Sequence, residues 1–552
     1  MELTDADKPL PEDQYPPTYF THPDHKAAIY GHIALMVLSW LFVLPTAVML
    51  SIARSRYTLF VQFGFLALNT GGMLLGIVYN ANTPDLYPNN AHHKLGWIVT
   101  MTVASQVAIG VLARVAGMMK RGELGHTGEH QGFIPVSTEA MQAHESAFSG
   151  PYRRFSHDSG QGTELGSETL RSHSTSSPPA SPTISSHPTH KEYRHEDEFE
   201  DEDLEHNVPT LKKTGKALSL VARVAGKISD RFWRILMLAY HFVDRTILIL
   251  SFITLCTGII TYGRFFEGNQ IFSGMAHWIK GGVFVWLGVW TLGRWAGSFG
   301  ELGWAWNVRP KKAGQKWCPS AEFVESALIF FYGSTNVFLE HLGGWGGEWS
   351  PQDLEHVSIA VLFIGGGLCG MLIESTRIRN LLNYHVIETT DDDHLDRDQL
   401  GEPETYSFSL NPIPALVIIL TGLMMSSHTQ ESMISSMVHK QWGDLITAAS
   451  FARALSYVVM YLKPPRSIYP SRPPTELLTA FGLIAGGVLF MASASDTIDG
   501  MIRYQLDPMF MYTVTMGFVA SMMAWVILLV AIKGWAARRE ATFGRLTGKV
   551  YA

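Results

Sequence analysis

Residues 508–533 read PMFMYTVTMGFVASMMAWVILLVAIK, and the one charged residue of this run, Lys533, stands at its end. The hydrocarbon core of a bilayer is about 30 Å thick, so a helix needs roughly 20 mostly apolar residues to cross it. The run therefore predicts a transmembrane helix. About eleven such runs occur along the chain, at 27–52, 57–80, 95–116, 235–262, 276–299, 321–340, 355–376, 412–428, 437–462, 476–494 and 508–533. They predict an all-α, polytopic membrane helical bundle with about eleven transmembrane helices.

The composition agrees with a membrane protein and argues against several classes of function. Of the 552 residues, 47% are hydrophobic and only 16% are charged, although a polar central stretch dilutes the apolar share. The formal charge of −7 gives no reason to expect a nucleic acid partner. The cysteines Cys256, Cys318 and Cys369 form no CxxC pair, which argues against a disulfide framework or a thiolate zinc site. The first 25 residues are acidic and Pro-rich, so they do not predict a cleavable signal peptide.

Lys and Arg residues gather on alternate loops between the predicted spans. Arg54 and Arg56 follow the first span, and Arg538 and Arg539 follow the last, whereas the loop NANTPDLYPNNAHH has neither Lys nor Arg. Cytoplasmic loops carry an excess of these residues. The sequence thus predicts an extracytoplasmic tail at 1–25, a cytoplasmic tail at 536–552 and an odd number of spans, in the plasma membrane or an endomembrane.

The polar stretch at 117–215 interrupts the apolar pattern. It contains RSHSTSSPPASPTISSHPTH and HEDEFEDEDLEH, a composition typical of disordered chain. We therefore predict a disordered cytoplasmic linker between a three-span module at 26–116 and an eight-span module at 235–535. Ser156, after two arginines, and the Ser-Pro pairs at Ser177 and Ser181 are candidate sites for kinases. An inert tether is the alternative.

Histidines near the predicted membrane boundary fall almost entirely on the extracytoplasmic side. Leu-Glu-His occurs at both ends of the loop after the sixth span, at 339–341 and at 354–356. Imidazole and carboxylate groups are ligands for transition metals. The set that predicts a metal site is Glu340, His341, Glu355, His356, His428 and His439. The alternative is that these polar side chains simply prefer the membrane boundary.

The ninth predicted span carries Asp444 and, well inside its apolar run, Arg453. A charge within the bilayer is costly and normally faces a partner inside the bundle. Nine residues separate the two, so we expect Arg453 to pair with another span, and Glu325 and Glu374 are candidates. The pairing suits either a structural clamp between helices or a relay or substrate contact.

The first module carries HIALMVLSWLFVLP from His32 and HKLGWIVTMTVASQ from His93. It resembles the transmembrane cytochrome b-561 superfamily at His32, Leu35, Met36, Trp40 and Pro45, and at His92, Gly96 and Gln106. The resemblance implies that His32 and His92 are axial ligands of a b-type haem. Thr58 stands where that family has a second haem ligand, four residues before Gln62, so the resemblance implies one haem rather than two.

The chain as a whole resembles a fungal family of multi-span membrane proteins that is named after a yeast transmembrane protein. The segments that carry this resemblance are DLYPNNAHHKLGW, HWIKGGVFVWLGVWTLGRWAGSFGELGWAWN and the FLEHLGG…LEHVS hairpin. It covers about residues 20–116 and 235–535. It implies a membrane location and leaves the chemistry open.

Three functions remain open at this point. The first is a redox membrane protein with one outer-face haem, the second a metal-handling transporter or channel, and the third a noncatalytic membrane scaffold. The sequence shows no P-loop, GxSxG or HExxH motif, so no soluble-enzyme signature decides whether the protein is an enzyme. The lipid bilayer is the one partner that the composition requires.

Overall fold

The computed structural model describes residues 5–127, 228–268, 270–310, 318–337, 347–388, 401–427, 430 and 432–547. Helices account for the regular structure of these residues, and they contain no strand. Residues Met1–Val111 and Ser229–Ala552 form one compact unit. The prediction of an all-α polytopic membrane protein is confirmed.

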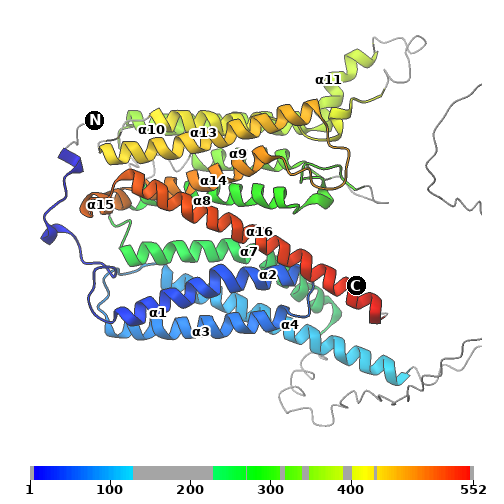
Figure 1. Ribbon diagram of the computed structural model, residues 1–552, viewed down its shortest axis with the longest axis horizontal. Helices are drawn as coiled ribbons and strands as arrows, with labels where there is room; N and C mark the ends of the chain where they lie inside the picture. Colours follow the sequence, from blue (N-terminus) through cyan, green and yellow to red (C-terminus); the bar gives the residue numbers. More distant parts are fainter. Residues whose placement is uncertain are drawn as a thin grey trace, which may run out of the picture. The chain divides into compact units, whose positions relative to one another are not determined.

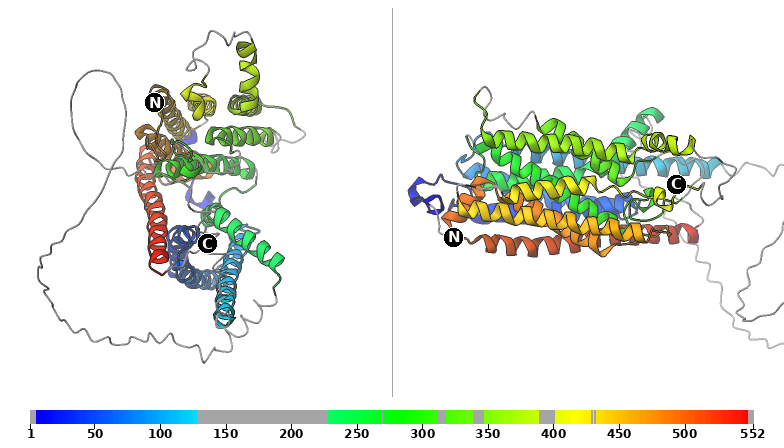
Figure 2. Two further views of the ribbon diagram at one scale, coloured as in Figure 1. Left: turned by 90° about the vertical axis from the view of Figure 1, so that its right-hand side faces the viewer. Right: turned by 90° about the horizontal axis from the view of Figure 1, so that it is seen from above.

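The helices of the unit run roughly along one direction (Figure 1). The first module holds α1 (Lys26–Val37), the π-helical turn η3 (Leu38–Val43), α2 (Leu44–Ile52), α3 (Thr58–Asn82) and α4 (His92–Thr127). The second holds α7 (Asp230–Gly263), α8 (Gln270–Ala296), α9 (Ala321–Asn336), α10 (Pro351–Glu374), α11 (Thr376–Glu388), α12 (Ile413–Ser427), α13 (Met433–Leu462), α14 (Pro474–Ala492), α15 (Ser495–Arg503) and α16 (Pro508–Thr547). Seen along the helices, α7 lies with the first module, and α16 runs beside both groups (Figure 2).

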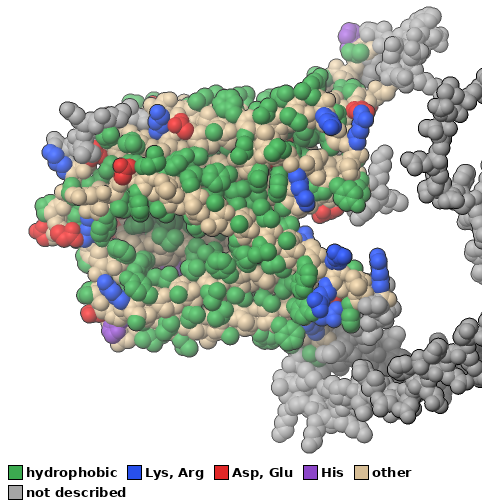
Figure 3. Space-filling view, viewed as in Figure 1, with side chains coloured by type: hydrophobic (Ala, Val, Ile, Leu, Met, Phe, Trp, Pro, Cys, Tyr) green, Lys and Arg blue, Asp and Glu red, His purple; other side chains and the backbone are tan. Residues whose placement is uncertain are grey.

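Among the described residues, eight helical segments are long and apolar enough to cross a membrane, including the first span over Lys26–Ile52 and the last over Pro508–Phe543. The other three predicted spans coincide with helices α8, α9 and α12, which are not among these eight; α12 is a shorter apolar helix. Figure 3 shows hydrophobic side chains over the middle of one face, with charged side chains gathered towards both ends. This band is the surface that a bilayer requires.

Several helices extend beyond the predicted spans. The candidate span in α4 ends at Ala116, as predicted, while the helix itself continues to Thr127; α16 continues to Thr547, beyond the predicted span end at 533. Helix α7 begins at Asp230 because Ser229 caps it, accepting a hydrogen bond from the backbone N–H of Phe232. The amphipathic helices α11 and α15 were not predicted, since neither has an apolar run long enough to span. The candidate kinase sites Ser156, Ser177 and Ser181 lie outside the described residues.

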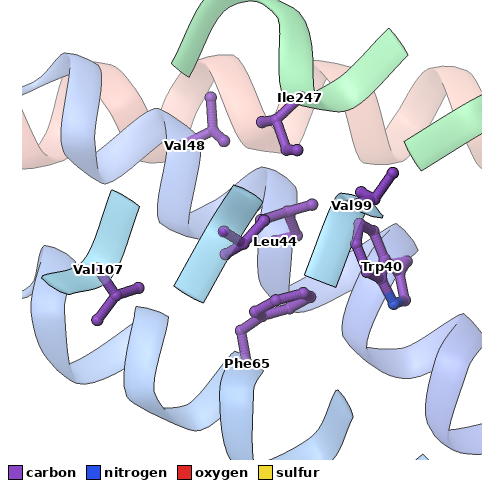
Figure 4. Close-up of a cluster of buried hydrophobic side chains, with 8 residues drawn as sticks. Trp40, Leu44, Val48, Phe65, Val99, Val107 and Ile247 are labelled. Atoms are coloured by element: carbon purple, nitrogen blue, oxygen red, sulfur yellow. The ribbon is translucent and has the colours of Figure 1, made fainter. Parts of the chain in front are cut away.

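The first module packs around an apolar core shared with α7. Trp40, Leu44 and Phe65 meet Val99 of α4 and Ile247 of α7, all at most 6% exposed (Figure 4). The Trp40 indole N–H donates to Asn69 Oδ1 at 2.9 Å, so its polar atom is satisfied inside the core. Trp40, which the sequence singles out as a motif residue, is therefore a core residue.

Pro45 ties α16 to the first span. A proline inside a helix has no N–H to give to the carbonyl four residues earlier, which here belongs to Leu41. The indole N–H of Trp525 on α16 donates to that carbonyl oxygen at 2.9 Å. The backbone acceptor freed by Pro45 thus joins helices that lie almost 500 residues apart in sequence.

The N-terminal tail contacts α7, the segment after α3 and the start of α13. We call this end of the unit, where α1 begins, the His32 end. Phe20 N–H donates to the carbonyl of Tyr262 on α7, and Tyr19 contacts Asp85 after α3. Asp7, 8% exposed, accepts hydrogen bonds from Ser432 Oγ at 2.7 Å and from two backbone N–H groups that open α13. The tail therefore caps a helix of the second module.

We expect Asp7→Ala to lower the free energy of unfolding by about 1 kcal/mol, since the N-terminal N–H groups of α13 lose their acceptor. Thermal unfolding of the purified full chain in detergent measures the effect. Asp13→Ala is the matched control, because Asp13 is exposed in the same tail. Equal midpoints for the two variants would show that the tail does not stabilise α13.

Candidate functional site

His32 and His92 lie close together, His32 in the second turn of α1 and His92 at the first residue of α4. Their ring centroids lie 6.3 Å apart, and the ring planes cross at 84°. His32 Nδ1 lies 2.8 Å from the carbonyl oxygen of Gly72 on α3. His92 Nδ1 lies 3.3 Å from Thr257 Oγ1 on α7. Each imidazole is thus held by a helix other than its own.

These bonds fix which ring nitrogen carries the hydrogen. A carbonyl oxygen only accepts, so His32 must donate from Nδ1. Thr257 already donates its hydroxyl hydrogen to the carbonyl of Thr254 at 2.8 Å, so His92 must donate to Thr257 from Nδ1 as well. Both neutral rings therefore keep the lone pair on Nε2, the form that binds a metal ion.

Two glycines leave the space that the imidazole rings of His32 and His92 occupy. A Cβ on Gly76 of α3 would lie 2.7 Å from His32 Nδ1, and a Cβ on Gly258 of α7 would lie 3.0 Å from His92 Cε1. Any side chain at Gly76 would therefore displace the His32 ring. The sequence analysis missed both glycines, because the contacts they allow join separate helices.

A second pair of histidines, His277 of α8 and His439 of α13, meets at the same end. Their ring centroids lie 5.8 Å apart at 89°. Each Nδ1 donates to the carbonyl oxygen four residues earlier, that of Ser273 for His277 and that of Ser435 for His439. The sequence placed His439 in the metal set but did not pair it with His277.

The rest of the predicted metal set is not assembled by the described residues. Glu355 is exposed on α10, and His356 is half-buried one residue later. Glu340, His341 and His428 lie outside the residues that the structure describes. Within those residues, no group of three or more His, Cys, Asp or Glu side chains could hold a metal ion. Because half of this set lies outside the described residues, the metal site stays a prediction.

Arg453 does pair with other helices, as the sequence predicts. Its Nη1 donates to both carboxylate oxygens of Glu325 on α9, at 2.9 and 3.1 Å. Its Nε and Nη2 donate to Glu476 Oε2 on α14, at 3.2 and 3.1 Å, and Nη2 also donates to Thr291 Oγ1 on α8. All three charged side chains are at most 3% exposed.

A second arginine completes this buried charge cluster. Arg294 of α8 donates to Glu325 Oε1 at 3.1 Å and to Glu322 Oε1 at 3.0 Å, and its Nε donates to the carbonyl of Trp304. The charge cluster, made of Arg294, Glu322, Glu325, Arg453 and Glu476, therefore joins four helices at the end opposite His32. The sequence analysis missed Arg294, although it stands inside a predicted span.

Two of the predicted charges lie elsewhere. Glu374, the other candidate partner of Arg453, instead accepts hydrogen bonds from Ser320 and Ser409, each at 2.6 Å. Asp444 is exposed on α13. Of the two charges that the sequence singles out in the ninth span, Arg453 is thus buried and Asp444 exposed.

Comparisons with known proteins agree with this two-part architecture. Residues 250–534 match the family model "Protein YTP1-like, C-terminal", and residues 13–116 match a domain of unknown function, DUF2427. The uncharacterized membrane protein C3B8.06 of Schizosaccharomyces pombe is 32% identical over 524 residues, which cover 93% of this chain and 94% of that protein. The chain belongs to the YTP1-like family. The family resemblance seen in the sequence is thereby confirmed.

Two proteins of Saccharomyces cerevisiae are also similar to this YTP1-like chain. The uncharacterized membrane protein YCR061W is 39% identical over 317 residues, which cover 55% of this chain and 49% of that protein. Protein YTP1 is 24% identical over 185 residues, 33% of each chain. No solved structure matches the chain. The relatives support a membrane protein and name no ligand.

Proposed function

We propose that this YTP1-like protein binds one b-type haem between His32 and His92 and acts in one-electron redox chemistry. The observation that carries the proposal is the facing pair of imidazoles with both Nε2 lone pairs available. A metal–imidazole bond is about 2.0 to 2.1 Å long, so two imidazoles on opposite sides of one ion have ring centres roughly 6 Å apart. The observed 6.3 Å fits that arrangement.

The number of ligands favours haem over a bare metal ion. A structural or catalytic zinc site needs three or four protein ligands, and the described residues offer no such group. In haem the porphyrin supplies the equatorial nitrogens, so two axial histidines suffice. The resemblance of the first module to cytochrome b-561 supports the same ligands. Haem iron supplies a one-electron couple whose potential depends on axial ligands and burial.

The chain's own residues would set the properties of the site. The Nδ1–H bonds to Gly72 and Thr257 orient the rings and raise the basicity of Nε2. At the position of the second family ligand, Thr58 is 5% exposed and donates to the carbonyl of Ser55 at 2.8 Å. Thr58 therefore serves helix α3 as a local hydrogen-bonding residue, which supports a single haem.

We also propose that the His32 end faces away from the cytoplasm. The support is the sequence pattern, in which Lys and Arg gather on the loops at the opposite end. With this orientation the proposed haem lies near the extracytoplasmic surface.

We expect the full-length protein, expressed with added haem and purified in detergent, to show a Soret band that corresponds to one haem per chain. His32→Ala and His92→Ala should each abolish the band, because one imidazole cannot complete the axial coordination. Absorption spectra and a haem-to-protein ratio measure this. His93→Ala is the matched control, since His93 is the exposed neighbour of His92 and should leave the band unchanged.

Size-exclusion profiles separate loss of haem from loss of folding. A monodisperse variant without the Soret band supports the assignment. Folded wild-type protein that takes up no haem would overturn the proposal, as would a band that survives in both alanine variants.

A further inference from the structure

Asp244 is a buried carboxyl in the middle of the candidate span Arg231–Gly263, and the proposed haem site does not use it. It is 4% exposed. Its Oδ2 accepts a hydrogen bond from Ser51 Oγ on α2 at 2.7 Å, and its Oδ1 accepts one from Gln106 Nε2 on α4 at 2.6 Å. Asp244 of α7 is therefore bonded to two helices of the first module, α2 and α4.

The two side chains that donate hydrogen bonds to this carboxyl, Ser51 and Gln106, are neutral. None of the ion pairs found among the described residues includes Asp244. The nearest titratable neighbours on its own helix, His241 and Arg245, are exposed. An ionised carboxylate without a cation is strongly disfavoured in an apolar interior, and such a group normally takes up a proton. This differs from the charge cluster, where two arginines face the carboxylates.

A chain of hydrogen bonds leads away from Asp244. Ser51 Oγ lies 2.9 Å from the Tyr240 hydroxyl, and that hydroxyl lies 3.5 Å from Gln62 Nε2 on α3. Gln62 is 3% exposed, and its Oε1 is a buried oxygen to which nothing in the described residues donates. The amide nitrogen and oxygen of a glutamine exchange places when the amide turns over.

We propose that Asp244 is a proton-binding site and that the bound proton sets the direction of this hydrogen-bond chain. With Asp244 ionised, Gln62 donates to Tyr240, Tyr240 to Ser51 and Ser51 to the carboxylate. With a proton on Oδ2, the carboxyl donates to Ser51, Ser51 to Tyr240, and Tyr240 to the amide oxygen of Gln62 after the amide turns. In the second direction the buried Gln62 oxygen gains the donor that it lacks in the first.

A cavity beside the carboxyl gives the proton a route. The cavity has a volume of about 340 Å³ and is lined in part by Thr102, Ser105, Gln106 and Tyr240. Gln106 both lines the cavity and donates to Asp244, so one side chain separates the two. Polar groups at this depth of a span are unusual unless they serve such a path. Gln62 and Gln106, which the sequence shows as motif residues, thus have a role that needs no haem.

Infrared spectroscopy of the full-length protein in lipid vesicles tests the proposal. At pH 7 we expect the C=O stretching band of a protonated carboxyl, shifted in D₂O and absent in Asp244→Asn. Asp444→Asn is the matched control, because Asp444 is an exposed aspartate on α13, and it should leave the band in place. Tyr240→Phe should shift the band without removing it, since the hydroxyl next in the chain is lost.

The asparagine variant should also keep the thermal midpoint of the wild type at pH 7, because Asn resembles the neutral carboxyl. A band that persists in Asp244→Asn overturns the proposal. If that variant does not fold, wild-type protein labelled with [4-¹³C]aspartate replaces it. A carboxyl band that moves with the label and responds to Tyr240→Phe supports the site, and a band that does neither overturns it. No haem is needed for this readout, so the haem proposal stands or falls separately.

Discussion

Arg453→Met should lower the free energy of unfolding by about 3 to 5 kcal/mol, the usual effect of removing one partner from a buried ion pair. Arg453 donates to Glu325 and to Glu476, which are 2% and 0% exposed. Methionine fills similar space but leaves both carboxylates without that cation. Glu325 keeps its hydrogen bond from Arg294, so the loss of a cationic partner affects Glu476 most. Equilibrium unfolding in mixed detergent measures the loss.

Three further variants make the result specific. Arg453→Lys should lie between wild type and Arg453→Met, because lysine keeps the charge but cannot donate to two carboxylates in the same fork geometry. Adding Glu476→Gln to Arg453→Met should restore part of the stability, since it removes a stranded charge. Asp444→Asn, on the same helix but exposed, should have no measurable effect. Equal stability of Arg453→Met and Asp444→Asn would show that the charge cluster does not stabilise the helix bundle.

The sequence predicted the helices well because crossing a membrane depends on local composition. Long apolar runs such as that of α16 form spans whatever they pack against. The boundaries were less predictable, because a helix such as α4 can continue past its apolar part, to Thr127. Helix α15 was not predicted because it is short and lies at the end of the bundle rather than across it.

Single residues of the candidate sites could be predicted from the sequence, but the contacts between them could not. Arg453 stands out because a charge in a span is rare, and this reasoning also identified Glu325. The same reasoning applies to Arg294 and Asp244, which also stand in predicted spans. Glu476 opens α14 and resembles an ordinary first-turn acid, so only tertiary contact reveals its role. The positions of the His32 and His92 rings depend on the space beside Gly76 and Gly258. These residues lie on different helices from the histidines, so no local sequence pattern connects them.

Gly487→Ala is expected to destabilise the protein by about 2 to 3 kcal/mol, as overpacking does in a tight core. Helices α8 and α14 approach most closely where Gly281 faces Gly487. A Cβ on either residue would lie 2.6 Å from the carbonyl oxygen of the other, closer than real contacts allow. The obstacle is backbone, so the helices themselves must move apart. Small residues permit such close packing between membrane helices.

Gly517→Ala is the control for this change, since nothing lies within 4 Å of a Cβ at that position of the α16 span. Alanine favours a helix over glycine by about 1 kcal/mol, so Gly517→Ala should raise the thermal midpoint slightly while Gly487→Ala lowers it. Opposite shifts of the thermal midpoint separate the effect of packing from that of helix propensity.

The charge cluster gives a second readout, because Arg453 of α13 donates hydrogen bonds both to Thr291 of α8 and to Glu476 of α14. Separating α8 from α14 should weaken that cluster, so Gly487→Ala combined with Arg453→Met should lower stability by less than the sum of the two single effects. Full additivity would mean that the glycine contact and the charge cluster stabilise the bundle independently.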